Sequence, residues 1–125
     1  MERGAIQELV RRWLQDAIGG RKLEVFDELL SVDSAPFKQR AAAIHAAFSD
    51  LQTSVDELLI DGDNIAWRWS VSGTHVGDFG GVAPTGRRVT LQGVNFQRLE
   101  GGRVAQHWTL ADTAGVLQQL RRSDA

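Results

Sequence analysis

The sequence contains no cysteine, no tyrosine, one methionine and two prolines. Without cysteine, the chain has no disulfide bond, no thiolate metal ligand and no cysteine nucleophile. No apolar run reaches the length of about 18 residues that a membrane-spanning helix needs, and the N-terminus lacks the apolar stretch of a secretory signal. These absences predict a cytoplasmic protein with no membrane partner.

Positive charge is not in excess either. The formal net charge at pH 7 is −2 and the sequence pI is near 5.9, so the sequence predicts no nucleic-acid partner. The three histidines, His45, His75 and His107, are too widely spaced to form a metal site that a sequence motif would reveal. We therefore expect no bound metal and no cofactor.

A chain of 125 residues is expected to form a single domain over residues 1–125. Apolar residues recur at helical spacing over residues 6–18, which predicts a helix that ends at Gly19-Gly20. A second, short helix is predicted over residues 23–30. A third is predicted from residues 34–36, where proline suits the first turn, to about residue 48.

From residue 52 onward the apolar period falls from 3.6 to about two, which predicts strands. Four strands are expected, at about 53–60, 65–72, 88–99 and 103–112, followed by a short C-terminal helix that holds Val116 and Leu120. Helices followed by antiparallel hairpins are typical of the α+β class, with the helices gathered on one side of the sheet.

The last hairpin predicts which side chains share a face. A two-residue turn at Gly101-Gly102 pairs Glu100 with Arg103, and the register then follows by counting outward. One face receives Leu91, Gly93, Asn95, Trp108, Leu110 and Asp112, and it is the predicted pocket face because it combines apolar side chains with a few polar groups. The other face holds Thr90, Val94, Phe96, His107 and Thr109, and it predicts association into a homodimer. Only a β-bulge would bring His107 to the pocket face.

The second half of the chain resembles the SnoaL-like polyketide cyclases, a branch of the nuclear transport factor 2-like superfamily. The order and spacing of several short motifs carry the resemblance: Asp61-Gly62-Asp63, Ser72-Gly73-Thr74-His75, the segment from Gly81 to Val89, the segment from Phe96 to Val104, His107-Trp108, Asp112, and the segment from Gly115 to Leu120.

The resemblance implies a cone-shaped, curved antiparallel sheet with the N-terminal helices packed on its concave face, and a homodimer formed through the sheet. It also implies an aldol-type cyclisation without metal or cofactor, in which an aspartate that matches Asp112 is the general acid/base, or, as in relatives, an epoxide-opening ring closure. The chain departs from the family between its second and third helices, where only Ser31 to Phe37 replaces a longer segment.

Asp112 allows two interpretations. In an apolar pocket its carboxyl group would take and return a proton near neutral pH. Alternatively, it caps the helix that begins at Thr113, because aspartate favours that position. The predicted pocket around Asp112 comprises Trp108, Asn95, His75, Trp67, Trp69, Leu91 and Leu110, with His107 and His45 as further candidates.

Other interpretations of these residues stay open. Trp67, Trp69 and His45 also fit plain core packing, and His75 also fits a loop histidine. Asn95 is suited to hold a carbonyl or enolate oxygen. Two functions follow: a cofactor-free cyclase or isomerase for a polyketide-like or other apolar small molecule, or a non-catalytic binding or dimerisation module of the same fold.

Overall fold

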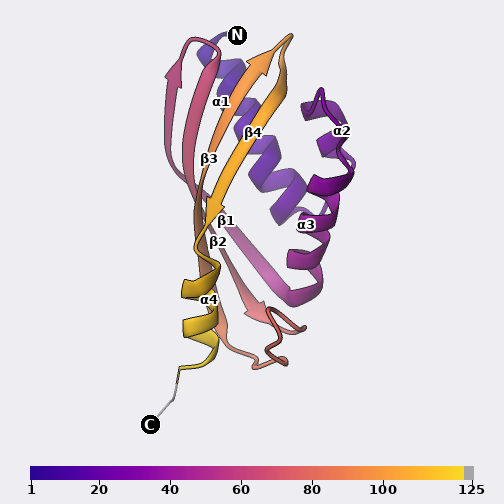
Figure 1. Cartoon of the computed structure of the whole chain (residues 1–125), viewed down its shortest axis with the longest axis vertical. Helices are drawn as coiled ribbons and strands as arrows, with labels where there is room; N and C mark the ends of the chain where they lie inside the picture. Colours follow the sequence, from indigo (N-terminus) through magenta and orange to yellow (C-terminus); the bar gives the residue numbers. More distant parts are fainter. Residues whose placement is uncertain (123–125) are drawn as a thin grey trace.

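The computed structural model describes residues 1–122 and has the predicted α+β fold (Figure 1). The elements in chain order are α1 (Arg3–Arg11), η1 (Arg12–Gly19), α2 (Val25–Leu29), α3 (Ala35–Ala47), β1 (Phe48–Asp61), β2 (Asn64–His75), β3 (Arg88–Glu100), β4 (Arg103–Ala111) and α4 (Thr113–Leu120). The strands form one antiparallel sheet in the order β1-β2-β3-β4.

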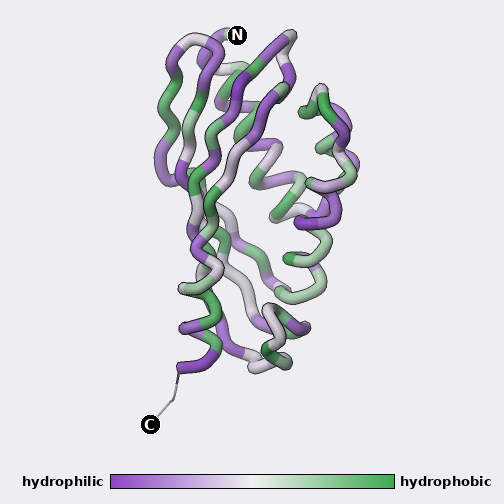
Figure 2. Tube along the Cα trace, viewed as in Figure 1, coloured by the Kyte–Doolittle hydropathy of each residue, from purple (hydrophilic) through white to green (hydrophobic). Residues whose placement is uncertain are grey.

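Helices α1 to α3 cover one face of the sheet, and the hydrophobic core lies between these two layers (Figure 1). Along β2, the side chains of Ile65, Trp67, Trp69 and Val71 all point into this core and are at most 9% exposed. Figure 2 shows hydrophobic and hydrophilic residues alternating along the strands. The two-residue period of the sequence therefore identified the covered face of β2 correctly.

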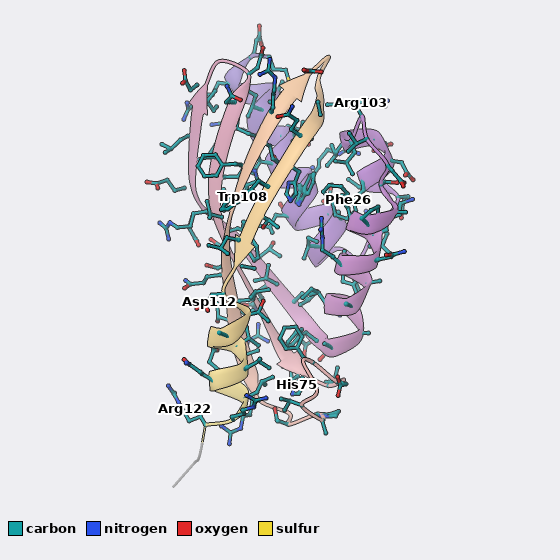
Figure 3. All side chains as sticks on the ribbon, in the orientation of Figure 1. Phe26, His75, Arg103, Trp108, Asp112 and Arg122 are labelled. Atoms are coloured by element: carbon teal, nitrogen blue, oxygen red, sulfur yellow. The ribbon has the colours of Figure 1, made fainter. Side chains whose placement is uncertain are left out.

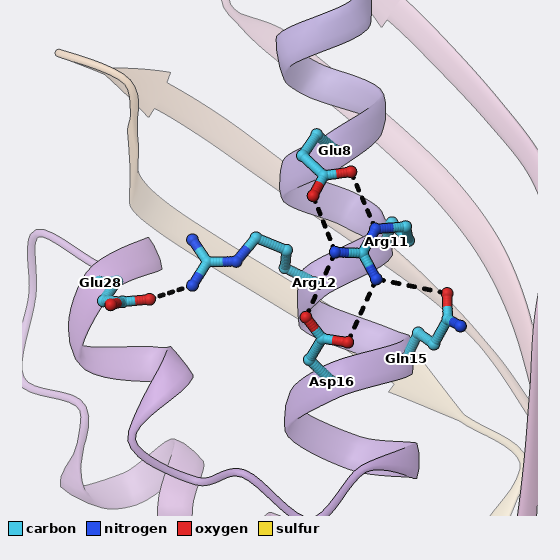
Figure 4. Close-up of polar contacts among 6 residues, drawn as sticks. All are labelled: Glu8, Arg11, Arg12, Gln15, Asp16 and Glu28. Atoms are coloured by element: carbon cyan, nitrogen blue, oxygen red, sulfur yellow. Dashed lines mark hydrogen bonds and ion pairs between the residues drawn. The ribbon is translucent and has the colours of Figure 1, made fainter.

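The N-terminal helix changes its geometry at residue 12. It begins as the α-helix α1 and continues as the π-helix η1, in which hydrogen bonds join residues five apart. Arg11 spans the junction, because its guanidinium binds Glu8 three residues earlier and Asp16 five residues later (Figure 4). The apolar stripe predicted a helix here but not its π form, in which the adjacent Trp13 and Leu14 are both buried.

The hairpin of β3 and β4 begins in the predicted register and then changes it. Leu99 pairs with Val104, but the next pair is Arg98 with Gln106. Ala105 is therefore the extra residue of a β-bulge. Beyond a bulge, every side chain of the strand moves to the opposite face, because side chains alternate with a period of two.

The bulge overturns the predicted faces of β4. Trp108 lies opposite Phe96 on the uncovered outer face, where 53% of the tryptophan is exposed, and Leu110 lies there with 63% exposed. The expectation that Trp108 and Leu110 line the pocket is therefore wrong. His107 and Thr109, expected on the outer face, point instead toward the helices.

The C-terminal helix α4 forms where the sequence predicted it and packs against β3. The side-chain amide of Gln119 donates to the carbonyl oxygen of Thr90 and accepts from its N–H, both at 2.9 Å. Val116 and Leu120 are the buried residues of α4. These contacts close the end of the sheet that the N-terminal helices leave open.

Candidate active site

A cavity of about 290 Å³ lies between η1, α2 and α3 on one side and the inner faces of β2, β3 and β4 on the other. Its walls are mainly apolar, with the aromatic residues Trp13, Phe26, Phe37, Trp67, Trp69 and Phe79 and the aliphatic residues Leu14, Ile18, Ala41, Ile44, Val71, Leu91 and Ala111. Five polar residues complete the lining: Arg40, Asn95, His107, Thr109 and Thr113. An apolar cavity with a few convergent polar groups is the usual form of a small-molecule site.

His107, a polar residue of the cavity wall, is held in place by a chain of two hydrogen bonds that crosses three strands. The indole Nε1–H of Trp67 donates to Oε1 of Gln97 at 3.0 Å, and Nε2 of Gln97 lies 3.0 Å from Nδ1 of His107. An indole N–H can only donate, so the Gln97 atom that faces it must be the oxygen. The amide NH₂ of Gln97 then donates to Nδ1 of His107, and the imidazole carries its proton on Nε2.

The charge state of His107 follows from its surroundings. Its ring stacks on Trp13, with centroids 5.1 Å apart and planes 21° apart, and meets the edge of Phe37. Burial, and the nearby positive charge of Arg40, lower the pKa of His107 to about 4. At neutral pH the ring is therefore uncharged and presents Nε2–H, which has no hydrogen-bond partner among the described residues.

A parallel set of hydrogen bonds holds Asn95, which is only 3% exposed. Its Oδ1 accepts from Nε1–H of Trp69 at 3.1 Å and from the hydroxyl of Thr109 at 2.7 Å. Because two donors use the oxygen, the amide NH₂ of Asn95 is left for a ligand, with no partner within residues 1–122. Asn95 and His107 are diagonal neighbours on one face of the sheet, and both line the cavity.

The cavity wall is rich in donors and poor in negative charge. Within residues 1–122, no aspartate or glutamate lines it, and its charged residue is Arg40. The guanidinium carbon of Arg40 lies 4.8 Å from the ring centroid of Phe37. This wall is suited to an oxygen atom that carries partial or full negative charge.

Several predicted pocket residues lie in this wall, namely Trp67, Trp69, Leu91 and Asn95, together with the further candidate His107. The hydrogen bonds of the wall also involve Gln97, which the sequence did not single out. A signal was present, since Gln97 stands two residues after Asn95 on the same face of a strand, but its partner His107 was assigned to the other face.

Asp112 does not lie in the cavity. Its side chain is exposed and caps α4, because Oδ1 accepts from the backbone N–H of Gly115 at 2.8 Å. It borders a shallow depression on the outer face, beside Arg68 and Leu110. The expectation of a carboxyl group inside the apolar pocket is therefore wrong in its placement, and the capping interpretation is confirmed. Figure 3 shows Asp112 where β4 passes into α4.

The two other histidines also lie outside the cavity wall. His75 is fully buried toward the lower end of the sheet (Figure 3), and its Nδ1 accepts from the N–H of Thr85 at 3.1 Å. It therefore fastens the loop that precedes β3, rather than reaching the pocket mouth as expected. His45 bonds to the carbonyl oxygen of Ile18 at 2.7 Å and joins α3 to the end of η1.

A curved antiparallel sheet, closed by N-terminal helices around an aromatic cavity, defines a protein of the nuclear transport factor 2-like fold. Within this fold, the family model of the SnoaL-like polyketide cyclases matches residues 8–120, and the chain belongs to that family. No curated protein matches the sequence.

Solved structures agree with this assignment over nearly the whole chain. TsrD from Streptomyces laurentii is 25% identical with a TM-score of 0.86, covering 97% of this chain and 98% of its own. A candidate polyketide cyclase from Acidithiobacillus ferrooxidans is 25% identical with a TM-score of 0.83 and the same coverage. AclR, a candidate hydroxylase from Streptomyces galilaeus, is 28% identical with a TM-score of 0.80, covering 98% of this chain and 85% of its own.

Two further findings concern possible partners. In the part of the chain that the structure describes, no helix is long and apolar enough to cross a membrane. Over the same residues, no group of three or more histidine, aspartate and glutamate side chains is arranged to hold a metal ion.

Proposed function

We propose that this protein is a cofactor-free cyclase or isomerase for a polyketide-like or other apolar carbonyl compound. The observation that carries the proposal is the pair of free donors, Nδ2 of Asn95 and Nε2 of His107, in a mainly apolar wall. A ketone oxygen between them accepts from both. The same donors bind more strongly once that oxygen becomes an enolate oxygen, which lowers the barrier to its formation.

In an aldol-type ring closure, a proton leaves the carbon next to the ketone, and the enolate carbon forms a bond to a second carbonyl carbon. The alkoxide that results then takes up a proton. We assign to Asn95 and His107 the stabilisation of the negative oxygen, and to water at the pocket mouth the transfer of the protons. A neutral imidazole is suited to stabilising this oxygen, because its N–H donates a hydrogen bond while the ring itself stays uncharged.

The second candidate is a module that binds the same class of molecule without converting it. It is favoured by the exposed position of Asp112 and by a cavity wall without a carboxylate among the described residues. Asp112 as a general acid/base, which the resemblance implies, stays a prediction and has its own test in the Discussion.

Exchange of hydrogen for deuterium at the α-carbon of β-tetralone, followed by proton NMR, separates the two candidates. An enzyme that stabilises the enolate speeds the exchange, whereas a binding module does not. His107→Phe keeps the ring stack but removes the N–H, and we expect it to slow the catalysed exchange by about 10²-fold. His45→Phe, the same change outside the cavity wall, serves as the control and should leave the rate unchanged.

Bound β-tetralone that exchanges no faster than free β-tetralone would rule out the enzyme and leave the binding module. Tetralin, which has the same shape without the oxygen, reports on the apolar walls alone. Its affinity should be similar in the wild type and in His107→Phe.

A further inference from the structure

We propose that the natural ligand carries a carboxylate, and that Arg40 at the cavity mouth binds it. The ligand would then be an apolar, ring-containing acid with a carbonyl group at its other end. This inference rests on the proposed function for the carbonyl end, but the recognition of the acid by Arg40 can be tested separately.

The first support is the state of Arg40 itself. It lines the cavity from α3, and within residues 1–122 it has no ion pair with a carboxylate. Three other cations of the helical layer are paired: Arg11 with Glu8 and Asp16, Arg12 with Glu28 (Figure 4), and Lys38 with Asp27. Arg40 is thus a positive charge that borders an apolar cavity without an acidic neighbour to neutralise it.

The second support is the position of the guanidinium. Its carbon lies over the ring of Phe37, at 4.8 Å from the centroid, which restricts its side-chain freedom before any ligand arrives. The N–H groups of a guanidinium form a planar fork that matches the two oxygens of a carboxylate, and this geometry favours arginine over lysine at such sites.

The third support is the spacing of the polar groups. Arg40 and His107 contact the same Phe37 ring, at 4.8 Å and 5.1 Å from its centroid, so the guanidinium and the imidazole lie within about 10 Å of each other. A ligand of two fused rings with a polar group at each end keeps both groups within this limit. Its carbonyl would meet His107 and Asn95 on the sheet, and its carboxylate would meet Arg40 on the helix.

The test compares β-naphthoate with β-naphthamide, which have nearly the same shape but differ by one charge. Isothermal titration calorimetry measures both Kd values in the wild type, in Arg40→Gln and in the matched control Arg103→Gln. Arg103 lies in the β3–β4 hairpin and does not line the cavity. Its substitution therefore makes the same change in net charge away from the site.

We expect the wild type to prefer the acid, and Arg40→Gln to weaken acid binding about tenfold or more while leaving amide binding within about twofold. Arg103→Gln should keep the preference of the wild type. Arg40→Lys keeps the charge without the planar guanidinium, and it should retain only part of the preference. The preference should also decrease as salt is added, because the mouth is open to solvent.

Equal loss of acid and amide binding in Arg40→Gln would mean that Arg40 only packs on Phe37, and it would overturn the inference. Equal affinity of the wild type for both compounds, or no binding of either, would overturn it as well. None of these results alters the exchange test with β-tetralone, which is neutral and depends on His107. The proposed function and the inference can therefore fail independently.

Discussion

Gln97 donates a hydrogen bond from its side-chain Nε2 to Nδ1 of His107 across 3.0 Å, and this contact decides which imidazole nitrogen faces the cavity. The amide cannot rotate to the opposite orientation, because its oxygen is held by the indole N–H of Trp67. Three strands thus cooperate to present a single N–H to a ligand.

Replacement of Gln97 by glutamate tests this relationship. A carboxylate still accepts from Trp67, but it cannot donate to Nδ1 of His107. We expect the proton of the neutral ring to move to Nδ1, or the ring to become cationic, because a neighbouring negative charge raises the pKa of a histidine. Nitrogen-15 NMR of the imidazole distinguishes these states from the Nε2–H form expected in the wild type. An Nε2–H form in both proteins would show that Gln97 does not set the tautomer.

The lowered pKa of His107 predicts a loss of stability in weak acid. The ring titrates near pH 6.5 when unfolded and near pH 4 when folded, so between these values the unfolded chain binds more protons. The free energy of unfolding should therefore decrease as the pH falls from about 6.5 to about 4. Urea denaturation of the wild type and of His107→Phe measures this, and the variant should lose part of the dependence.

Burial also lowers the pKa of His45, so some dependence on pH should persist in His107→Phe. The relevant quantity is the difference between the two proteins across the pH range. A difference that does not change between pH 6.5 and pH 4 would contradict the lowered pKa of His107.

Asp112 has a capping role in the structure, and its role in catalysis can be tested by two substitutions. Asparagine caps a helix about as well as aspartate, so Asp112→Asn should preserve the stability, whereas Asp112→Ala should cost about 1 kcal/mol. If the carboxyl group is also the general acid/base, both variants should lose about 10²- to 10⁴-fold in turnover. Thermal unfolding and the exchange of β-tetralone provide the two measurements. Full activity of Asp112→Asn would leave Asp112 as a cap alone.

A homodimer through the outer face of the sheet is a further prediction. Phe96 and Trp108 meet edge to face there, with centroids 5.8 Å apart, and are 54% and 53% exposed. Leu59 and Leu110 add two more exposed apolar side chains. Exposed apolar patches of this kind mark interfaces.

Light scattering at micromolar concentration should therefore give the mass of a dimer. Trp108→Lys should shift the protein toward the monomer without unfolding it, because the side chain lies outside the core. Gln106→Lys places the same charge on the same strand, also at an exposed position, and should have a weaker effect. A monomer mass for the wild type would refute the prediction.

Local patterns in the sequence were sufficient to predict the order of the helices and strands and the covered faces of β2 and β3. The apolar stripe of the N-terminal helix, the alternation along β2 and the Gly101-Gly102 turn each depend on residues close together in the chain. Local sterics and periodicity are sufficient to predict such features. The composition of the cavity was partly foreseen for the same reason, since Trp67, Trp69 and Asn95 lie on strands whose faces were predicted correctly.

The tertiary structure decided the rest, and above all the bulge at Ala105. The preceding residue, Val104, pairs with Leu99 on one side and accepts a hydrogen bond from the N–H of Ser31 at 3.0 Å on the other. That second contact joins segments far apart in the sequence, so no local pattern could reveal it. The resulting shift by one residue brought His107 into the cavity, turned Trp108 outward and left Asp112 as a helix cap, because neighbouring side chains of a strand point to opposite faces.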